Sequence, residues 1–168
     1  MKHLFTVVFS YLILHASYAQ DDEANPLAIL EPLMGKTWAI EANWGGGSLF
    51  KQELFVEYGL QDQVIYSYTK GFINSERTEF GDRSFGIRKY DKESDKLLFW
   101  EFDTFGGVTT GEIIPNGRDL WFVYSYGESV IADIWEYLDD ETYAFRVVSY
   151  NDGEIGDVYL KGAYKAKE

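Results

Sequence analysis

The spacing of apolar and polar residues changes once along this chain. Residues 27–34 are almost continuously apolar and lie between Pro26 and Gly35, which predicts a short helical turn or two. In residues 37–44 the apolar side chains occupy every second position, the period of a half-buried strand. The pattern therefore predicts a helical lead-in followed by β-structure.

The alternation of period two returns in short segments almost to the end of the chain, with Gly, Asn, Asp and Pro between them. We expect strands at 37–44, 49–58, 64–70, 84–90, 96–102, 108–114, 120–126, 130–138, 142–150 and 157–165, with a weaker one at 77–80. Connections this short favour neighbour-to-neighbour pairing, and closure leaves no long edge exposed. The predicted fold is all-β: a single antiparallel up-and-down β-barrel of about 8–10 strands.

The start of the chain has the features of a secretory signal peptide, predicted at residues 1–19. A basic start precedes an apolar run at 4–14, and small residues end at Ala19. The run is shorter than the roughly 20 residues that cross a bilayer, so we expect no membrane insertion after cleavage. Residues 20–26 are expected to be a flexible leader and 27–168 the barrel domain, in a secreted or periplasmic protein.

The composition removes several kinds of chemistry. The chain has 28 Asp and Glu against 15 Lys and Arg, a net charge of −13, two histidines and no cysteine. Cleavage after Ala19 would remove His3 and His15, which excludes catalytic triads and sites with His or Cys ligands from the mature chain. We therefore expect no metal site and no cofactor. The acidity also disfavours nucleic acid as a partner.

Aromatic residues and polar residues within apolar strands indicate a binding cavity. The chain has 5 Trp, 13 Tyr and 12 Phe, enough for a packed core or the wall of a pocket. A buried polar side chain needs a partner, which a ligand can supply; the candidates are Gln52, Arg88, Glu112, Asp133 and Arg146. The predicted ligand-binding residues are Trp44, Gln52, Tyr66, Tyr68, Arg88, Trp100, Glu112, Tyr124, Trp135 and Arg146.

Two segments resemble the calycin superfamily. Leu30-x-x-Leu33-Met34-Gly35-Lys36-Thr37-Trp38 precedes the first strand, and Tyr159-Leu160-Lys161-Gly162-Ala163-Tyr164-Lys165 ends the last. The chain is most similar to small secreted bacterial lipocalin-like domains, and more distantly to nitrobindin-type barrels, whose haem histidine it lacks after cleavage. The resemblance implies a small hydrophobic ligand inside the barrel, and Trp38 packed across its base with Lys161 or Lys165.

The leading functional prediction is a barrel that binds a small apolar or amphipathic ligand in an aromatic cavity, with Arg88 or Arg146 at an acidic end of the ligand. One alternative is a histidine-free enzyme of the cyclase or isomerase type, with Glu112 transferring the proton. Another is a protein-interaction module with an exposed aromatic face, and a homodimer is one form this could take. Iron ligation by Tyr159 or Tyr164 is a minor alternative.

Overall fold

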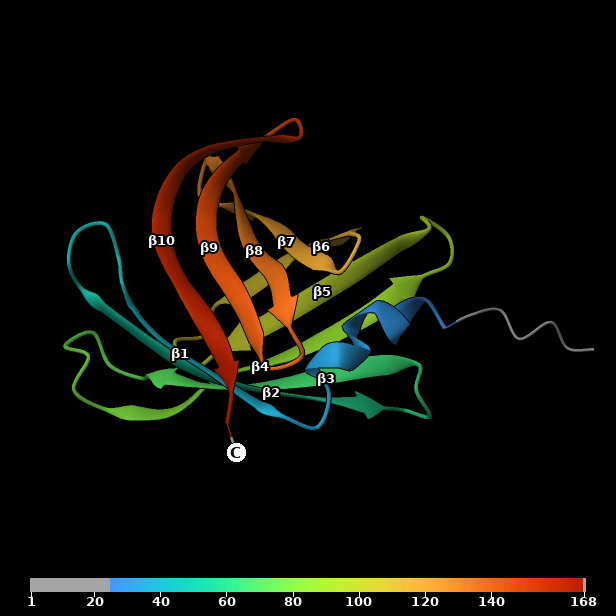
Figure 1. Cartoon of the computed structure of the whole chain (residues 1–168), viewed down its shortest axis with the longest axis horizontal. Helices are drawn as coiled ribbons and strands as arrows, with labels where there is room; N and C mark the ends of the chain where they lie inside the picture. Colours follow the sequence, from blue (N-terminus) through green and yellow to red (C-terminus); the bar gives the residue numbers. More distant parts are fainter. Residues whose placement is uncertain (1–24, 168) are drawn as a thin grey trace, which may run out of the picture.

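The computed structural model describes residues 25–167. The predicted signal peptide at 1–19 lies outside these residues, as does most of the predicted leader at 20–26. The described residues form a closed antiparallel β-barrel of ten strands with one short helix (Figure 1). The predicted all-β barrel is therefore confirmed.

Each strand pairs with its neighbours along the chain, and β1 pairs with β10 to close the barrel. The elements are η1 (Pro26–Leu33), β1 (Thr37–Asn43), β2 (Leu49–Gly59), β3 (Val64–Phe72), β4 (Phe80–Asp91), β5 (Lys96–Asp103), β6 (Val108–Asn116), β7 (Asp119–Tyr126), β8 (Ser129–Asp139), β9 (Thr142–Asn151) and β10 (Glu154–Ala166).

The prediction of a weak strand at 77–80 is wrong, because the chain turns there. The Asn74 side chain accepts hydrogen bonds from the backbone N–H groups of Thr78 and Glu79. Arg77 has a φ of 55°, in the left-handed region that ends regular pairing. Strand β4 starts only at Phe80.

Helix η1 covers one end of the barrel. Asn25 caps it by accepting a hydrogen bond from the Leu27 N–H, and Pro26 occupies the first position, where no intrahelical donor is needed. The helix is of the 3₁₀ type, in which every third residue falls on the same face. Leu27, Leu30 and Leu33 have this spacing and are all buried in the main core.

Trp38 joins this helix to the barrel base, as the family resemblance implies. Its side chain is fully buried, and its Nε1–H donates to the Leu33 carbonyl at 3.0 Å. The expected basic partner is different, however. Lys36 Nζ lies 5.6 Å from the Trp38 ring, whereas Lys161 and Lys165 are exposed. The cation comes from the segment just before β1 because β10 directs these two lysines outward.

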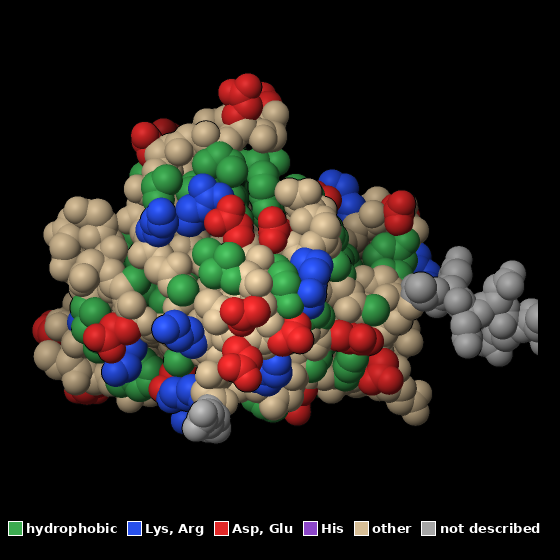
Figure 2. Space-filling model, viewed as in Figure 1, with side chains coloured by type: hydrophobic (Ala, Val, Ile, Leu, Met, Phe, Trp, Pro, Cys, Tyr) green, Lys and Arg blue, Asp and Glu red, His purple; other side chains and the backbone are tan. Residues whose placement is uncertain are grey.

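Apolar side chains also pack on the outer face of β7, β8 and β9. Ala132, Ile134 and Val148 are fully buried there, covered in part by Trp121 and Tyr150. This second cluster explains why these strands carry large apolar residues on both faces. Figure 2 shows Asp and Glu spread over the visible face, with Lys, Arg and hydrophobic side chains among them.

Candidate functional site

An interior cavity of about 350 Å³ occupies the end of the barrel away from η1. Leu27, Leu30, Leu33 and Trp38 of the main core fill the end beside η1, and other members of the same core face the cavity. Tyr126 lines the cavity and is 74% exposed, so it marks the rim toward solvent. The aromatic residues that line the interior are Trp44, Phe50, Phe99, Phe122, Tyr124, Trp135, Phe145 and Tyr164.

Contacts between rings make one wall of this cavity continuous. Trp44 and Phe50 meet edge to face at 5.6 Å, and Phe50 stacks against Phe145 at 6.3 Å. Trp135 contacts Phe145 at 5.6 Å and stacks on Tyr164 with their centroids 3.9 Å apart. Rings held by several neighbours lose little freedom when a ligand arrives, so this wall is a preformed apolar surface.

The opposite wall holds a buried ion pair. Arg88 is only 9% exposed, and its Nη2 lies 3.0 Å from Glu101 Oε2. Its Nη1 donates to Ser67 Oγ. Ser84 Oγ donates to Glu101 Oε1 at 2.6 Å, and Thr69 Oγ1 lies 3.5 Å from the same oxygen. A buried ion pair needs such additional hydrogen bonds to offset its loss of water.

The absence of a side chain at Gly86 makes room for this network. A Cβ there would lie 1.9 Å from Arg88 Nη1, 2.2 Å from Glu101 Oε2 and 2.5 Å from Ser67 Oγ. Real Cβ atoms do not approach polar atoms this closely, so any other residue would displace the pair. Gly86 is thus part of what builds the polar wall.

A second polar group, Asp133, faces the cavity from β8. Tyr124 Oη donates to Asp133 Oδ1 at 3.1 Å. Burial, with a smaller contribution from the charge of Glu101, raises the pKa of Asp133 to about 7, although the Tyr124 hydrogen bond opposes the shift. Burial likewise raises the pKa of Tyr124, and Asp133 raises it further. The cavity therefore holds a carboxyl group that changes protonation near neutral pH.

Five of the ten predicted ligand-binding residues line this cavity. They come from five strand regions that the barrel brings together: Trp44, Gln52, Arg88, Tyr124 and Trp135. The Gln52 side-chain oxygen accepts a hydrogen bond from Tyr164 Oη, so its polar group is satisfied within the wall.

A position in the cavity is wrong for the other five, which lie on the outer face of the barrel: Tyr66, Tyr68, Trp100, Glu112 and Arg146. In each case a neighbour in sequence takes the interior position, because successive side chains of a strand point to opposite faces. Glu112 pairs with Lys96 at 2.6 Å, and Arg146 pairs with Glu136 at 2.7 Å. Glu112 is thus not a desolvated carboxylate in the cavity.

Sequence reasoning missed Glu101, Ser67, Thr69, Ser84 and Arg83, which line the cavity or its polar network. Glu101 carried a usable signal, because it shares the alternation of Phe99 and follows that residue on the interior face. The small hydroxyl residues carried none, since Ser and Thr are common on either face of a strand.

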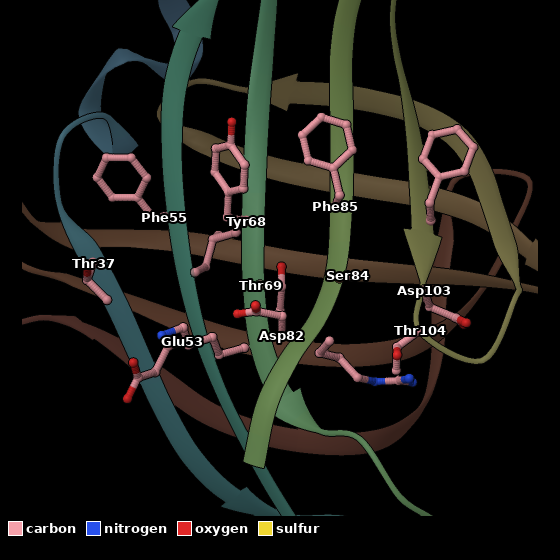
Figure 3. Close-up of a pocket in the computed structure, with 14 residues that line it drawn as sticks. Thr37, Glu53, Phe55, Tyr68, Thr69, Asp82, Ser84, Phe85, Asp103 and Thr104 are labelled. Atoms are coloured by element: carbon pink, nitrogen blue, oxygen red, sulfur yellow. The ribbon is translucent and has the colours of Figure 1, made fainter.

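The outer face of β2 to β5 carries a groove of about 670 Å³. Phe55, Tyr68, Phe85 and Phe102 stand in register across the four strands. Figure 3 shows the labelled rings Phe55, Tyr68 and Phe85 side by side, with Glu53 and other polar side chains below them. Tyr68 and Phe102 are 44% and 43% exposed, so the row is open to solvent.

Within residues 25–167, no helix is long and apolar enough to span a membrane. The same part of the chain contains no group of three or more Asp, Glu, His or Cys side chains placed to hold a metal ion.

No family model matches this chain, and no curated protein has significant sequence similarity to it. Among solved structures, the barrel is similar to the S-type phycobiliprotein lyase CPES from Guillardia theta. The TM-score is 0.51 at 7% identity, over 84% of this chain and 91% of that one. This similarity concerns the barrel fold alone. A redesigned β-barrel also matches, with a TM-score of 0.44 at 10% identity over 83% of this chain and 96% of that chain.

Proposed function

We propose that this protein is a secreted or periplasmic barrel that binds one small apolar or amphipathic molecule in its interior cavity. The observation that carries the proposal is the interior cavity of about 350 Å³, which has nine aromatic residues in its lining. This volume falls in the range of small-molecule pockets, roughly 300–1,000 Å³. The likeness to a phycobiliprotein lyase fits ligand binding in a barrel.

The polar groups of the cavity favour a ligand that is apolar over most of its length. Arg88 is already neutralised by Glu101, and Arg146 lies outside, so neither is free to meet an acidic end. Asp133 and Tyr124 are two groups of the lining that can exchange a hydrogen bond with a hydroxyl or amide of the ligand. The aromatic wall then provides most of the contact area.

Filling the cavity should abolish binding without disturbing the outer surface. Thr109 lines the cavity, and the next residue, Thr110, is exposed on the opposite face. We expect Thr109→Phe to lower the affinity for decanol at least about tenfold, because the new ring takes the ligand's place. Thr110→Phe adds the same ring outside and should leave the affinity unchanged. Isothermal titration calorimetry measures both, with thermal unfolding to verify the fold.

Equal decanol affinity in the two variants and the wild-type protein would exclude the cavity as the binding site, and absence of decanol binding to the wild type would contradict the proposal itself. The exposed aromatic row is the second candidate, either for an apolar ligand or for a partner protein. Binding that survives Thr109→Phe and is lost in Tyr68→Ala would assign the function to the outer groove, because Tyr68 stands at the middle of that row.

A further inference from the structure

A β-bulge directs Arg83 toward the mouth of the cavity. In the pairing of β3 with β4, Thr69 stands opposite Ser84 and Lys70 opposite Asp82, so Arg83 is the extra residue. Its carbonyl oxygen accepts a hydrogen bond from the Thr104 N–H at 2.9 Å, which joins the bulge to the turn after β5. Bulges of this kind change the direction of a side chain and are frequent beside functional sites.

The Arg83 side chain packs against the backbone of Gly71 on the neighbouring strand β3. A Cβ at Gly71 would lie 3.2 Å from Arg83 Cγ, closer than most side chains tolerate. The guanidinium carbon lies 4.2 Å from the centre of the Phe105 ring, a cation–π contact. Arg83 consequently lines the interior cavity as well as the pocket at its mouth.

The guanidinium of Arg83 lacks a partner for one of its donors. Its Nη1 is buried and has no hydrogen-bond partner among residues 25–167. Within this part of the chain, no carboxylate forms an ion pair with Arg83, in contrast to Arg88 and Glu101. A buried donor without a partner is destabilising, and more so when it is charged. An acceptor supplied from outside would remove this penalty.

The mouth pocket has a local charge opposite to that of the chain. It encloses about 310 Å³, and its lining includes Lys51, Arg77 and Arg83 but no Asp or Glu. Lys51 is paired with Glu41 at 3.3 Å, and Arg77 Nη1 donates to the Leu49 carbonyl. Arg77 and Arg83 are therefore the two cations of the mouth pocket without an ion-pair partner among residues 25–167, and of these two only Arg83 has a buried donor that lacks a hydrogen-bond partner. In a protein with a net charge of −13, such a spot selects for an anionic group.

The mouth pocket and the interior cavity share the side chains of Trp44, Phe50 and Gln52 as well as Arg83. Asp103 lines the interior cavity but not the mouth pocket, and its Oδ1 accepts two hydrogen bonds from backbone N–H groups of its own turn. The negative charge of Asp103 disfavours an anion in the interior. An anionic group is thus favoured at the mouth, and an apolar group inside.

We propose that Arg83 binds the carboxylate of an amphipathic ligand whose apolar part fills the aromatic cavity. The proposal rests on the proposed function, because the apolar part needs the cavity. It assigns the orientation of the ligand, with its charged end outward. A planar guanidinium with free N–H groups matches the two oxygens of a carboxylate, which Lys would contact only as a point charge.

Decanoate and decanol test the proposal, because they share a tail and differ in charge. In the wild-type protein we expect decanoate to bind about tenfold more tightly than decanol, as for one hydrogen-bonded charge pair. Arg83→Gln should remove this preference by weakening decanoate alone, and Arg83→Lys should restore part of it. Isothermal titration calorimetry at low salt gives the ratio of the two affinities for each variant.

Arg118→Gln is the matched control, since Arg118 is exposed at the end of the barrel that η1 covers and is paired with Asp140. It should keep the wild-type ratio. A wild-type protein that binds both ligands equally, or an Arg83→Gln variant that keeps the preference, overturns the role of Arg83 and leaves the cavity's function intact. Failure of both ligands to bind the wild type overturns the proposed function and this inference with it.

Discussion

Replacing Glu101 by Leu should lower the free energy of unfolding by about 3–5 kcal/mol, the range for breaking one side of a buried ion pair. Arg88 would keep its hydrogen bond to Ser67 but lose the carboxylate 3.0 Å from its Nη2. A buried guanidinium without its counter-charge is strongly unfavourable. Urea unfolding followed by far-UV circular dichroism measures the change.

An outer ion pair on the neighbouring strand provides the control. Glu112 pairs with Lys96, and both side chains are partly exposed. Glu112→Leu should therefore change stability by less than about 1 kcal/mol. The double variant Arg88→Met/Glu101→Leu should recover part of the loss, because no charge is then left unpaired. Equal effects of Glu101→Leu and Glu112→Leu would contradict the buried network.

The second large effect concerns Asp133 and pH. Its pKa is about 7 in the folded protein against an ordinary value of 3.8. The native state therefore holds a proton that the unfolded chain releases between these values, and the carboxyl destabilises the fold as pH rises through this window. Relative to the wild type, Asp133→Asn should gain up to about 4 kcal/mol between about pH 4 and pH 8. Asn keeps an acceptor for Tyr124.

Urea unfolding of both proteins across this pH window gives the difference directly. Asp152→Asn is the control, because Asp152 is an exposed residue of the turn between β9 and β10. Its difference from the wild type should stay flat over the window. A flat difference for Asp133→Asn as well would show that the folded protein does not hold this proton.

The strands could be predicted from the sequence because the alternation and the turn residues agree. Nearly every predicted segment coincides with an observed strand, and the dense turn signals favour neighbour pairing over longer crossings. The exception at 77–80 has a local cause. The Asn74 side chain accepts hydrogen bonds from the backbone of Thr78 and Glu79 and so forms a turn, which the apolar pattern does not indicate.

Whether a strand residue points into the barrel or away from it was predicted less well than the strands themselves. In β3, Ile65 and Tyr66 are consecutive and both apolar, so the sequence does not decide which one faces inward. The structure places Ile65 in the core and Tyr66 outside. The position of Arg83 at the cavity could not be predicted for a different reason. The direction of its side chain follows from a bulge that exists only when β3 and β4 pair.

The binding of a ligand inside the barrel is tested most directly by a crystal structure with bromodecanol, in which anomalous scattering locates the bromine. We predict a bromine peak within the interior cavity, beside Phe50, Phe122 and Trp135. A peak in the outer groove beside Tyr68, or none at a saturating concentration, would contradict binding in the cavity.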